Sequence, residues 1–179
     1  EVALRHAAAL GGHLRFGREA TYAGDLTAMR DDNDVDYAWL RFAALTLAAE
    51  CGFEWFATDN GVLSRTLGRD AGVVETYRPY EWRQSMKAIF RDHYLSDLVG
   101  FTYSKMGAEQ AADHLMARIV ENAGGRDALV PVILDGENAW EYFPESGREF
   151  LCQLYQRLSD TPGVRAVTVS EALERHAAT

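Results

Sequence analysis

A short apolar run that ends in acidic residues does most to limit the fold of this chain. Residues 130–134 read Val-Pro-Val-Ile-Leu, and so short a run rich in β-branched residues is typical of a buried parallel strand. Residues 135–138 read Asp-Gly-Glu-Asn, and Trp140, Tyr142 and Phe143 follow at once. Side chains that follow a parallel strand lie at its carboxyl end, where α/β proteins place their active sites. Carboxylates for acid/base chemistry beside aromatic rings that can stack on sugars predict a carbohydrate site.

Predicted strands alternate with predicted helices along the chain. The strands are expected at 53–58, 86–90, 130–134 and 164–169, and the helices at 1–17, 36–51, 62–67, 107–122 and 146–159, with a short last helix capped by Ser170. Residues 18–35 and 77–82 read as irregular segments. Strands separated by helices predict an α/β fold with a parallel sheet and right-handed crossovers. The length of 179 residues suits a single domain over residues 1–179.

Composition limits the partners and the compartment. The net charge of -9 argues against nucleic acid or an anionic membrane as the main partner. The chain has neither a signal peptide nor an apolar run of the ~18 residues that a membrane helix needs, so we expect a cytoplasmic protein. Its two cysteines, Cys51 and Cys152, lie in apolar helical patterns and are expected to be buried free thiols. Glu1 is not an initiator Met, which is consistent with a piece of a larger parent protein.

Three segments together resemble one family. Residues 133–158 are similar to a late motif of glycoside hydrolase family 57, the α-glucan-acting amylases, amylopullulanases, glucanotransferases and branching enzymes. Residues 52–63, which include Gly-Phe-Glu-Trp-Phe-Ala-Thr-Asp, and residues 89–101, which include Ile-Phe-Arg-Asp-His, resemble two earlier motifs. The three segments occur in the order and spacing of the family, and the resemblance covers roughly residues 36–175.

The resemblance implies a fold, a reaction and a catalytic residue. Members of the family have a seven-stranded β/α barrel, and this chain resembles its carboxyl-terminal part. They cleave or transfer α-glucosidic bonds with retention and without a cofactor, so we expect an α-glucan or oligosaccharide as substrate and no metal. Asp135 matches the general acid/base of the family. Partial burial beside Leu134 and Trp140 and the like charge of Glu137 are expected to raise the pKa of Asp135, as proton donation near neutral pH requires.

Further residues are candidates for substrate binding. Glu137 and Asn138 are expected to orient Asp135 or to bind sugar hydroxyls, and Trp140 either forms a stacking platform or closes the end of the sheet. The next candidates follow two other predicted strands: Asp59, and the three residues Arg91, Asp92 and His93. If the sheet is parallel, they open on the same face as Asp135, where charged groups can bind sugar hydroxyls. The alternative is an ion pair of Arg91 with Asp92 or Asp97 that braces the loop.

The nucleophile of the family has no counterpart here. A retaining glycosidase needs a second carboxylate roughly 5–5.5 Å from the first. Residues 29–37, at the position of that motif, contain no Glu, and the aspartates at 31, 32, 34 and 36 are the available substitutes. We therefore expect the polypeptide alone to be inactive. The alternative function is a non-catalytic glucan-binding or structural fragment that uses Trp140, Trp82 and Tyr142 as sugar platforms. A metal-dependent deacetylase would need an Asp/His/His ligand set, which the sequence does not supply.

Overall fold

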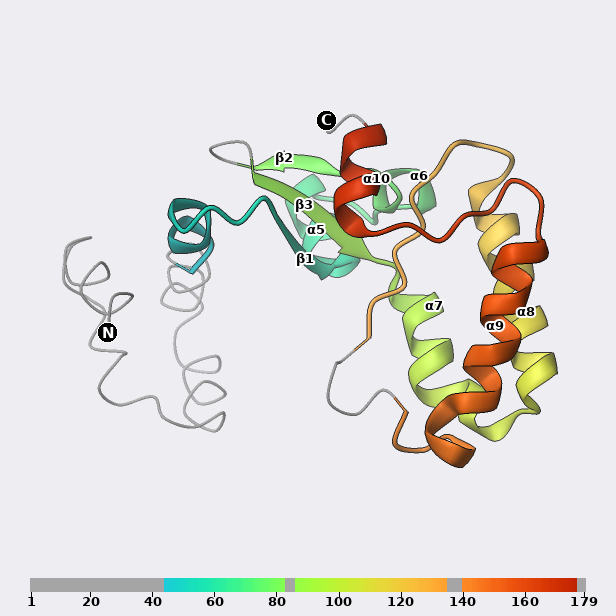
Figure 1. The fold of residues 1–179 in the computed structure, drawn as a ribbon. Coiled ribbons are helices and arrows are strands. Elements are labelled where there is room, and N and C mark those ends of the chain that lie inside the picture. The colour runs from blue at the N-terminus through green and yellow to red at the C-terminus, as the bar shows by residue number, and fades with distance from the viewer. Residues whose placement is uncertain (1–43, 83–85, 135–139, 177–179) are drawn as a thin grey trace, which may run out of the picture. The chain divides into compact units, whose positions relative to one another are not determined.

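A computed structural model describes residues 44–82, 86–134 and 140–176 (Figure 1). The chain divides into two compact units, Glu1–Glu54 and Trp55–Thr179. In the first unit, residues 44–50 are helical, and the helix ends at Gly52 in the left-handed conformation (φ 83°), as predicted. The predicted helix at 1–17, the predicted loop at 18–35 and the aspartate-rich run lie outside the described residues, so these predictions and that of a single domain stay predictions. The fold and the candidate site described below belong to the second unit.

A small mixed sheet forms the centre of the second unit. Its strands β1 (Trp55–Asp59), β3 (Met86–Arg91) and β2 (Tyr80–Trp82) lie in the order β1-β3-β2. The pair β1 and β3 is parallel, which confirms two predicted strands and their direction. The pair β2 and β3 is antiparallel, so the prediction of an irregular segment at 77–82 was wrong for its last residues, and the sheet is not purely parallel. Aromatic contacts hold β2: Tyr80 packs edge-on against Phe90, and Trp82 packs edge-on against Phe56.

Two further predicted strands are absent from the structure. Residues 130–134 form no strand, and the reason is local: Pro131 has no backbone N–H to give to a ladder. Residues 164–168 are not a strand either, and they lead into α10 (Val169–Arg175). Thr168, not Ser170, caps α10, through a capping box with Glu171. The described residues thus contain one three-stranded sheet in place of the predicted parallel sheet of about four strands.

α5 (Asn60–Leu67), α8 (Ala108–Ala123) and α9 (Arg148–Asp160) lie close to predicted helices, whereas the short helices α6 (Val73–Thr76) and α7 (His93–Asp97) were not predicted. α5 follows β1 directly, and α6 precedes β2. α7 follows β3 and continues into a π-helical turn, Leu98–Thr102. The two longest helices, α8 and α9, confirm the predictions at 107–122 and 146–159 and pack side by side (Figure 1).

Apolar residues of these helices form the larger core. Its buried members come from α7 to α9 and the turns between them: Leu95, Val99, Tyr103, Ala111, Ala112, Leu115, Phe143 and Phe150. A smaller cluster of Leu63, Ala88 and Phe90 joins α5 to the sheet. The prediction that the cysteines are buried was wrong, since Cys51 and Cys152 are both free and exposed. On α9, Phe150 is the buried residue, and Cys152, two positions on, points away from the core.

Candidate functional site

The carboxyl ends of β1 and β3 bring two predicted site residues together. Asp59 and Arg91 are direct partners in the parallel register of the two strands. Parallel neighbours end at the same edge of a sheet, so residues 32 positions apart in sequence meet there. Asp59 also caps α5, because its Oδ1 accepts a hydrogen bond from the Gly61 N–H over 2.8 Å. One carboxylate thus belongs both to a helix start and to a strand end.

Arg91 and His93 converge on the other oxygen of Asp59. Oδ2 of Asp59 accepts from Nε of Arg91 over 3.1 Å and lies 3.0 Å from Nη2 of the same side chain. Nδ1 of His93 lies 2.9 Å from the same oxygen. The guanidinium therefore engages one carboxylate oxygen through two nitrogens, a charge-assisted contact with a defined geometry.

Asp97 adds a second carboxylate on the far side of His93. Nε2 of His93 lies 2.9 Å from Oδ2 of Asp97, one helical turn later on α7, and Nη2 of Arg91 lies 3.6 Å from Oδ1. We call Asp59, Arg91, His93 and Asp97 the polar cluster. The imidazole stands between two carboxylates, so in its charged form it can donate to both. In its neutral form Nδ1 can accept from Nη2 of Arg91, which lies 2.8 Å away, while Nε2 donates to Asp97.

The polar cluster is open to solvent. The exposed fractions of the side chains are 27% for Arg91, 38% for Asp59, 36% for Asp97 and 55% for His93. Burial alone would raise the pKa of Asp59, but hydrogen bonds from His93, the Gly61 N–H and Arg91, together with the charge of Arg91, hold this pKa below its usual value. Asp59 is therefore ionised at neutral pH and suits the role of an acceptor, not of a proton donor.

Asp92, predicted beside these residues, faces the interior instead. It is 5% exposed, and its Oδ1 caps α7 by accepting from the Leu95 N–H over 2.8 Å. Its Oδ2 accepts from the hydroxyl of Tyr77 over 2.6 Å, and that hydroxyl accepts from Nδ2 of Asn122 over 3.0 Å. Both oxygens of Asp92 are thus committed to the protein. The signal for this was available in the sequence, since an Asp before a helical run is a typical helix cap.

The sequence predicted Asp97 only as an ion-pair partner of Arg91. The structure confirms this ion pair and adds a contact of Asp97 with His93. The spacing of His93 and Asp97, four residues apart on a helix, was the signal that could have found it. The proposed general acid/base Asp135, with Glu137 and Asn138, lies outside the described residues. The segment that precedes it is described, however. The C=O of Pro131 accepts from the Asp92 N–H over 2.9 Å, and the Ile133 N–H donates to Oγ of Ser96 over 3.1 Å.

These two hydrogen bonds fix the place of the segment that precedes residue 135. They hold residues 131–133 against the junction of β3 and α7, which also carries Arg91 and His93 of the polar cluster. The segment and the polar cluster thus share one supporting junction.

The sequence was also compared with known families and proteins. A search against models of protein families matches residues 32–179 to Glycosyl hydrolase family 57. The chain belongs to glycosyl hydrolase family 57. A search of curated proteins gave no significant match. Membership confirms the resemblance seen in the sequence and supports glycoside hydrolase or transglycosidase chemistry on a carbohydrate at the level of the family. It implies a β/α barrel, and the helices and three-stranded sheet described above are consistent with part of one.

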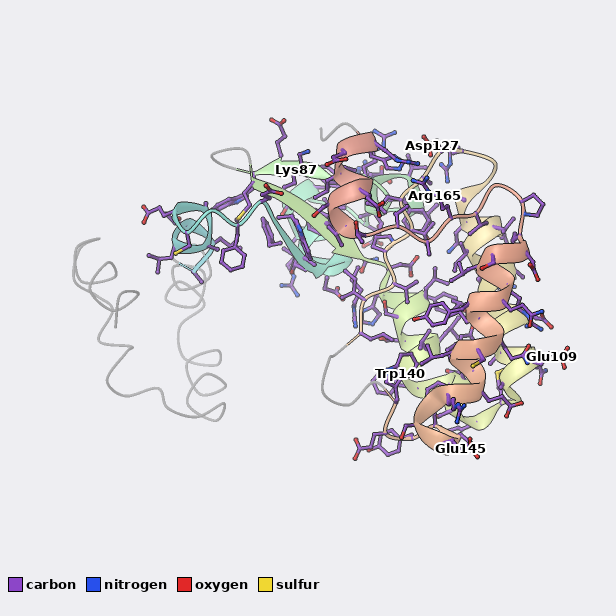
Figure 2. The ribbon with its side chains drawn as sticks, viewed as in Figure 1. Lys87, Glu109, Asp127, Trp140, Glu145 and Arg165 are labelled. Atoms are coloured by element: carbon purple, nitrogen blue, oxygen red, sulfur yellow. The ribbon has the colours of Figure 1, made fainter. Side chains whose placement is uncertain are left out.

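Trp140 of this family 57 chain packs into the protein. Its ring lies edge-on to Phe143 with centroids 5.5 Å apart, and 6.3 Å from the ring of Phe150 on α9. Figure 2 shows Trp140 beside α9. Gly147 comes so close that an added Cβ would lie 2.9 Å from Cε3 of Trp140. The ring is only partly buried, so one part of it closes the core while another part reaches solvent. A sugar contact by Trp140 stays a prediction.

A cavity of about 990 Å³ lies apart from the polar cluster. Its wall is mainly apolar and comes from α8, α9 and α10 and from residues 125–134 and 163–167. No member of the polar cluster lines it.

Within residues 44–82, 86–134 and 140–176, no group of three or more His, Cys, Asp or Glu side chains is arranged to hold a metal. In the same ranges, no helix is long and apolar enough to cross a bilayer.

Proposed function

We propose that this chain supplies part of the site of a retaining glycoside hydrolase or transglycosidase that acts on α-glucans. In this proposal, Asp135 is the general acid/base, and the polar cluster binds hydroxyl groups of a neighbouring glucose unit. The observation that carries the proposal is the shared junction: the hydrogen bonds of Asp92 and Ser96 tie the segment before Asp135 to the same strand end and helix start that carry the polar cluster.

The chemistry of the polar cluster fits a neutral, hydroxyl-rich ligand. Its carboxylates can accept hydrogen bonds from sugar hydroxyls, and the guanidinium of Arg91 can donate to their oxygens. The ionised state of Asp59 makes it a permanent acceptor. Because Arg91 is already held by Asp59, a ligand meets donors in a fixed geometry and little side-chain entropy is lost on binding.

The role of Asp135 in this proposal rests on its match to the family motif. For this role the carboxyl must stay protonated near neutral pH, and partial desolvation would favour its protonated form. Such a group can protonate the glycosidic oxygen as the bond breaks. The cleavage or transfer of α-1,4 or α-1,6 bonds, as in amylases and amylopullulanases, is the finer form of this proposal.

The missing nucleophile favours a second candidate. Because residues 29–37 contain no Glu at the family position, the chain can bind a glucan without cleaving it. It would then be a non-catalytic glucan-binding part of a larger enzyme. Both candidates use the polar cluster, and they differ in whether a bond is broken.

One experiment tests both candidates. The chain and its Asp135→Asn variant are titrated with a malto-oligosaccharide by tryptophan fluorescence, and the products are followed by chromatography. If one of the aspartates at 31, 32, 34 and 36 replaces the family nucleophile, the first candidate expects cleavage by the chain, at least about 100-fold less by the variant, and equal affinities. Asp127→Asn, the same change at a fully exposed position eight residues earlier, is the control and should leave both readouts unchanged. Binding without cleavage favours the second candidate, and no binding at millimolar ligand contradicts both.

A further inference from the structure

Two large aromatic side chains lie exposed on α7 and on the π-helical turn that continues it. Tyr94 has 57% of its surface exposed, and Phe101 has 68%. Neither ring takes part in a ring–ring contact between described residues. Single exposed apolar residues are common on proteins, so these two are informative only if they share one surface.

The burial pattern places both rings on the same side of the helix. The buried residues of this stretch recur at helical spacing: Leu95, Ser96, Val99 and Tyr103. The opposite side carries four exposed or partly exposed residues: His93, Tyr94, Asp97 and Phe101. We call these four residues the α7 face. Asp97 comes three residues after Tyr94 and four before Phe101, so each ring lies about one helical turn from this carboxylate.

The α7 face is continuous with the polar cluster. His93 and Asp97 belong to both, and Nε2 of His93 lies 2.9 Å from Oδ2 of Asp97. Nη2 of Arg91 lies 3.6 Å from Oδ1 of Asp97 and brings a further donor to the middle of the face. The surface beside Phe101 is open, since a Cβ added to Gly100 would meet no atom within 4 Å. A ligand that is bound by the polar cluster and extends along α7 therefore meets the two rings.

The mixture of charges and rings favours a carbohydrate over a protein partner. The centres of protein–protein interfaces are depleted of charged residues, whereas His93 and Asp97 stand in the middle of this face. A sugar needs both kinds of group, because its hydroxyls exchange hydrogen bonds with charged side chains and its C–H surface packs on aromatic rings. The net charge of -9 also disfavours an anionic membrane as the occupant.

We infer that the α7 face binds successive units of an α-glucan chain, with Tyr94 and Phe101 stacking on glucose rings whose neighbours are bound by the polar cluster. This inference rests on the proposed function, which supplies the glucan. It adds two binding residues to the site, and it makes affinity depend on the length of the oligosaccharide. Neither ring takes part in breaking a bond.

The test compares maltose with maltohexaose by isothermal titration calorimetry. The unchanged chain should bind maltohexaose more tightly, because only the longer ligand can contact the polar cluster and both rings. The double variant with Tyr94→Ala and Phe101→Ala should lose about tenfold in affinity for maltohexaose and less than about twofold for maltose. Phe101→Leu keeps an apolar side chain without a flat ring, and it should lose nearly as much as Phe101→Ala alone.

Tyr155→Ala is the matched control. Tyr155 is 60% exposed, similar to Tyr94, but it lies on α9 and lines the separate apolar cavity. This variant should bind both ligands as the unchanged chain does. Because all three aromatic residues are exposed, the variants should unfold at the same temperature as the unchanged chain to within a few degrees.

The outcomes separate this inference from the proposed function. If the unchanged chain binds maltohexaose and the double variant binds it equally well, the polar cluster binds glucan without the α7 face, and the inference alone fails. An equal loss in Tyr155→Ala would also overturn it, because the effect would then not depend on the place of the ring. If the unchanged chain binds neither ligand, the proposed function fails and the inference fails with it.

Discussion

Arg91 and Asp59 are register partners at the ends of two parallel strands, and Nε of Arg91 donates to Oδ2 of Asp59 over 3.1 Å. The polar cluster therefore depends on the pairing of these two strands. The strand pairing places the two Cα atoms side by side, and the charged groups only have to complete the contact. His93 and Asp97 then join from the helix that follows β3. The cluster should therefore be sensitive to the shape of its groups as well as to their charge.

Arg91→Lys should weaken glucan binding by about tenfold, or about 1.4 kcal/mol. Lysine keeps the charge but cannot contact Asp59 through two nitrogens, so the donors lose their fixed geometry. Isothermal titration calorimetry with a malto-oligosaccharide measures the change. Arg69→Lys, at an exposed arginine paired with Glu75 over 2.7 Å, is the control and should bind as the unchanged chain does. Equal affinity of Arg91→Lys and the unchanged chain would remove Arg91 from the binding role.

The contribution of Asp59 to stability should depend on pH. Its folded-state pKa is held below the ordinary value of 3.8, so its ionised form stabilises the fold above about pH 4, and this stabilisation is lost as the pH falls through the folded pKa. Urea unfolding of the chain and of Asp59→Asn should differ most at neutral pH, by less than about 1 kcal/mol because the carboxylate is partly exposed. The difference should shrink below about pH 4. A difference that grows with acidity would contradict the assignment.

Tyr77→Phe should lower the free energy of unfolding by about 1–3 kcal/mol, because it leaves Oδ2 of buried Asp92 without its donor and Nδ2 of Asn122 without its acceptor. Tyr80→Phe removes a hydroxyl that donates to the C=O of Glu75 from a less buried site, and it should cost about 0.5–1.5 kcal/mol. Chemical denaturation gives both values. If the two variants lose equal stability, the buried hydrogen bonds of the Tyr77 hydroxyl stabilise the fold no more than the hydrogen bond of the Tyr80 hydroxyl does.

Gly147→Ala should destabilise the packing around Trp140. Gly147 has a φ of 78°, and an added Cβ would lie 2.9 Å from the ring. Gly163 has nearly the same φ, 79°, with no atom within 4 Å of such a Cβ, so Gly163→Ala isolates the backbone cost of about 1–2 kcal/mol. Gly147→Ala should lower the free energy of unfolding by about 1 kcal/mol more than Gly163→Ala does. It should also alter the tryptophan emission. If the two variants lose equal stability in thermal unfolding, the Trp140 ring moves aside at no measurable cost.

The local elements of the fold were largely predictable from the sequence. Apolar periodicity and flanking glycines located α8 and α9, and the end of α8 at Gly124, with a φ of 58°, follows from its freedom to adopt the left-handed conformation. β1 and β3 were predictable because short apolar runs ending in polar residues are typical of buried strands. Residues 130–134 misled the same reasoning, since composition favoured a strand and one proline removed a donor.

The sequence predicted only some of the residues of the candidate site. Asp59, Arg91 and His93 were expected at strand ends and meet in the polar cluster. Asp92 carries the same charge as Asp59, yet it faces inward, because the backbone at the start of α7 needs a capping acceptor and Tyr77 lies close enough to donate. Ser96 gave no signal, since its partner Ile133 is 37 residues away and is reached only through the fold.

The sequence by itself determined the family, the positions of the main helices and the residue types available to the site, because these depend on local periodicity and on motifs that are contiguous in the chain. The tertiary structure alone decided which of the neighbouring charged side chains face solvent, that β2 pairs antiparallel to β3, and that Ser96 supports the segment before Asp135. These outcomes depend on hydrogen bonds between distant segments, and every buried donor must find its acceptor in three dimensions.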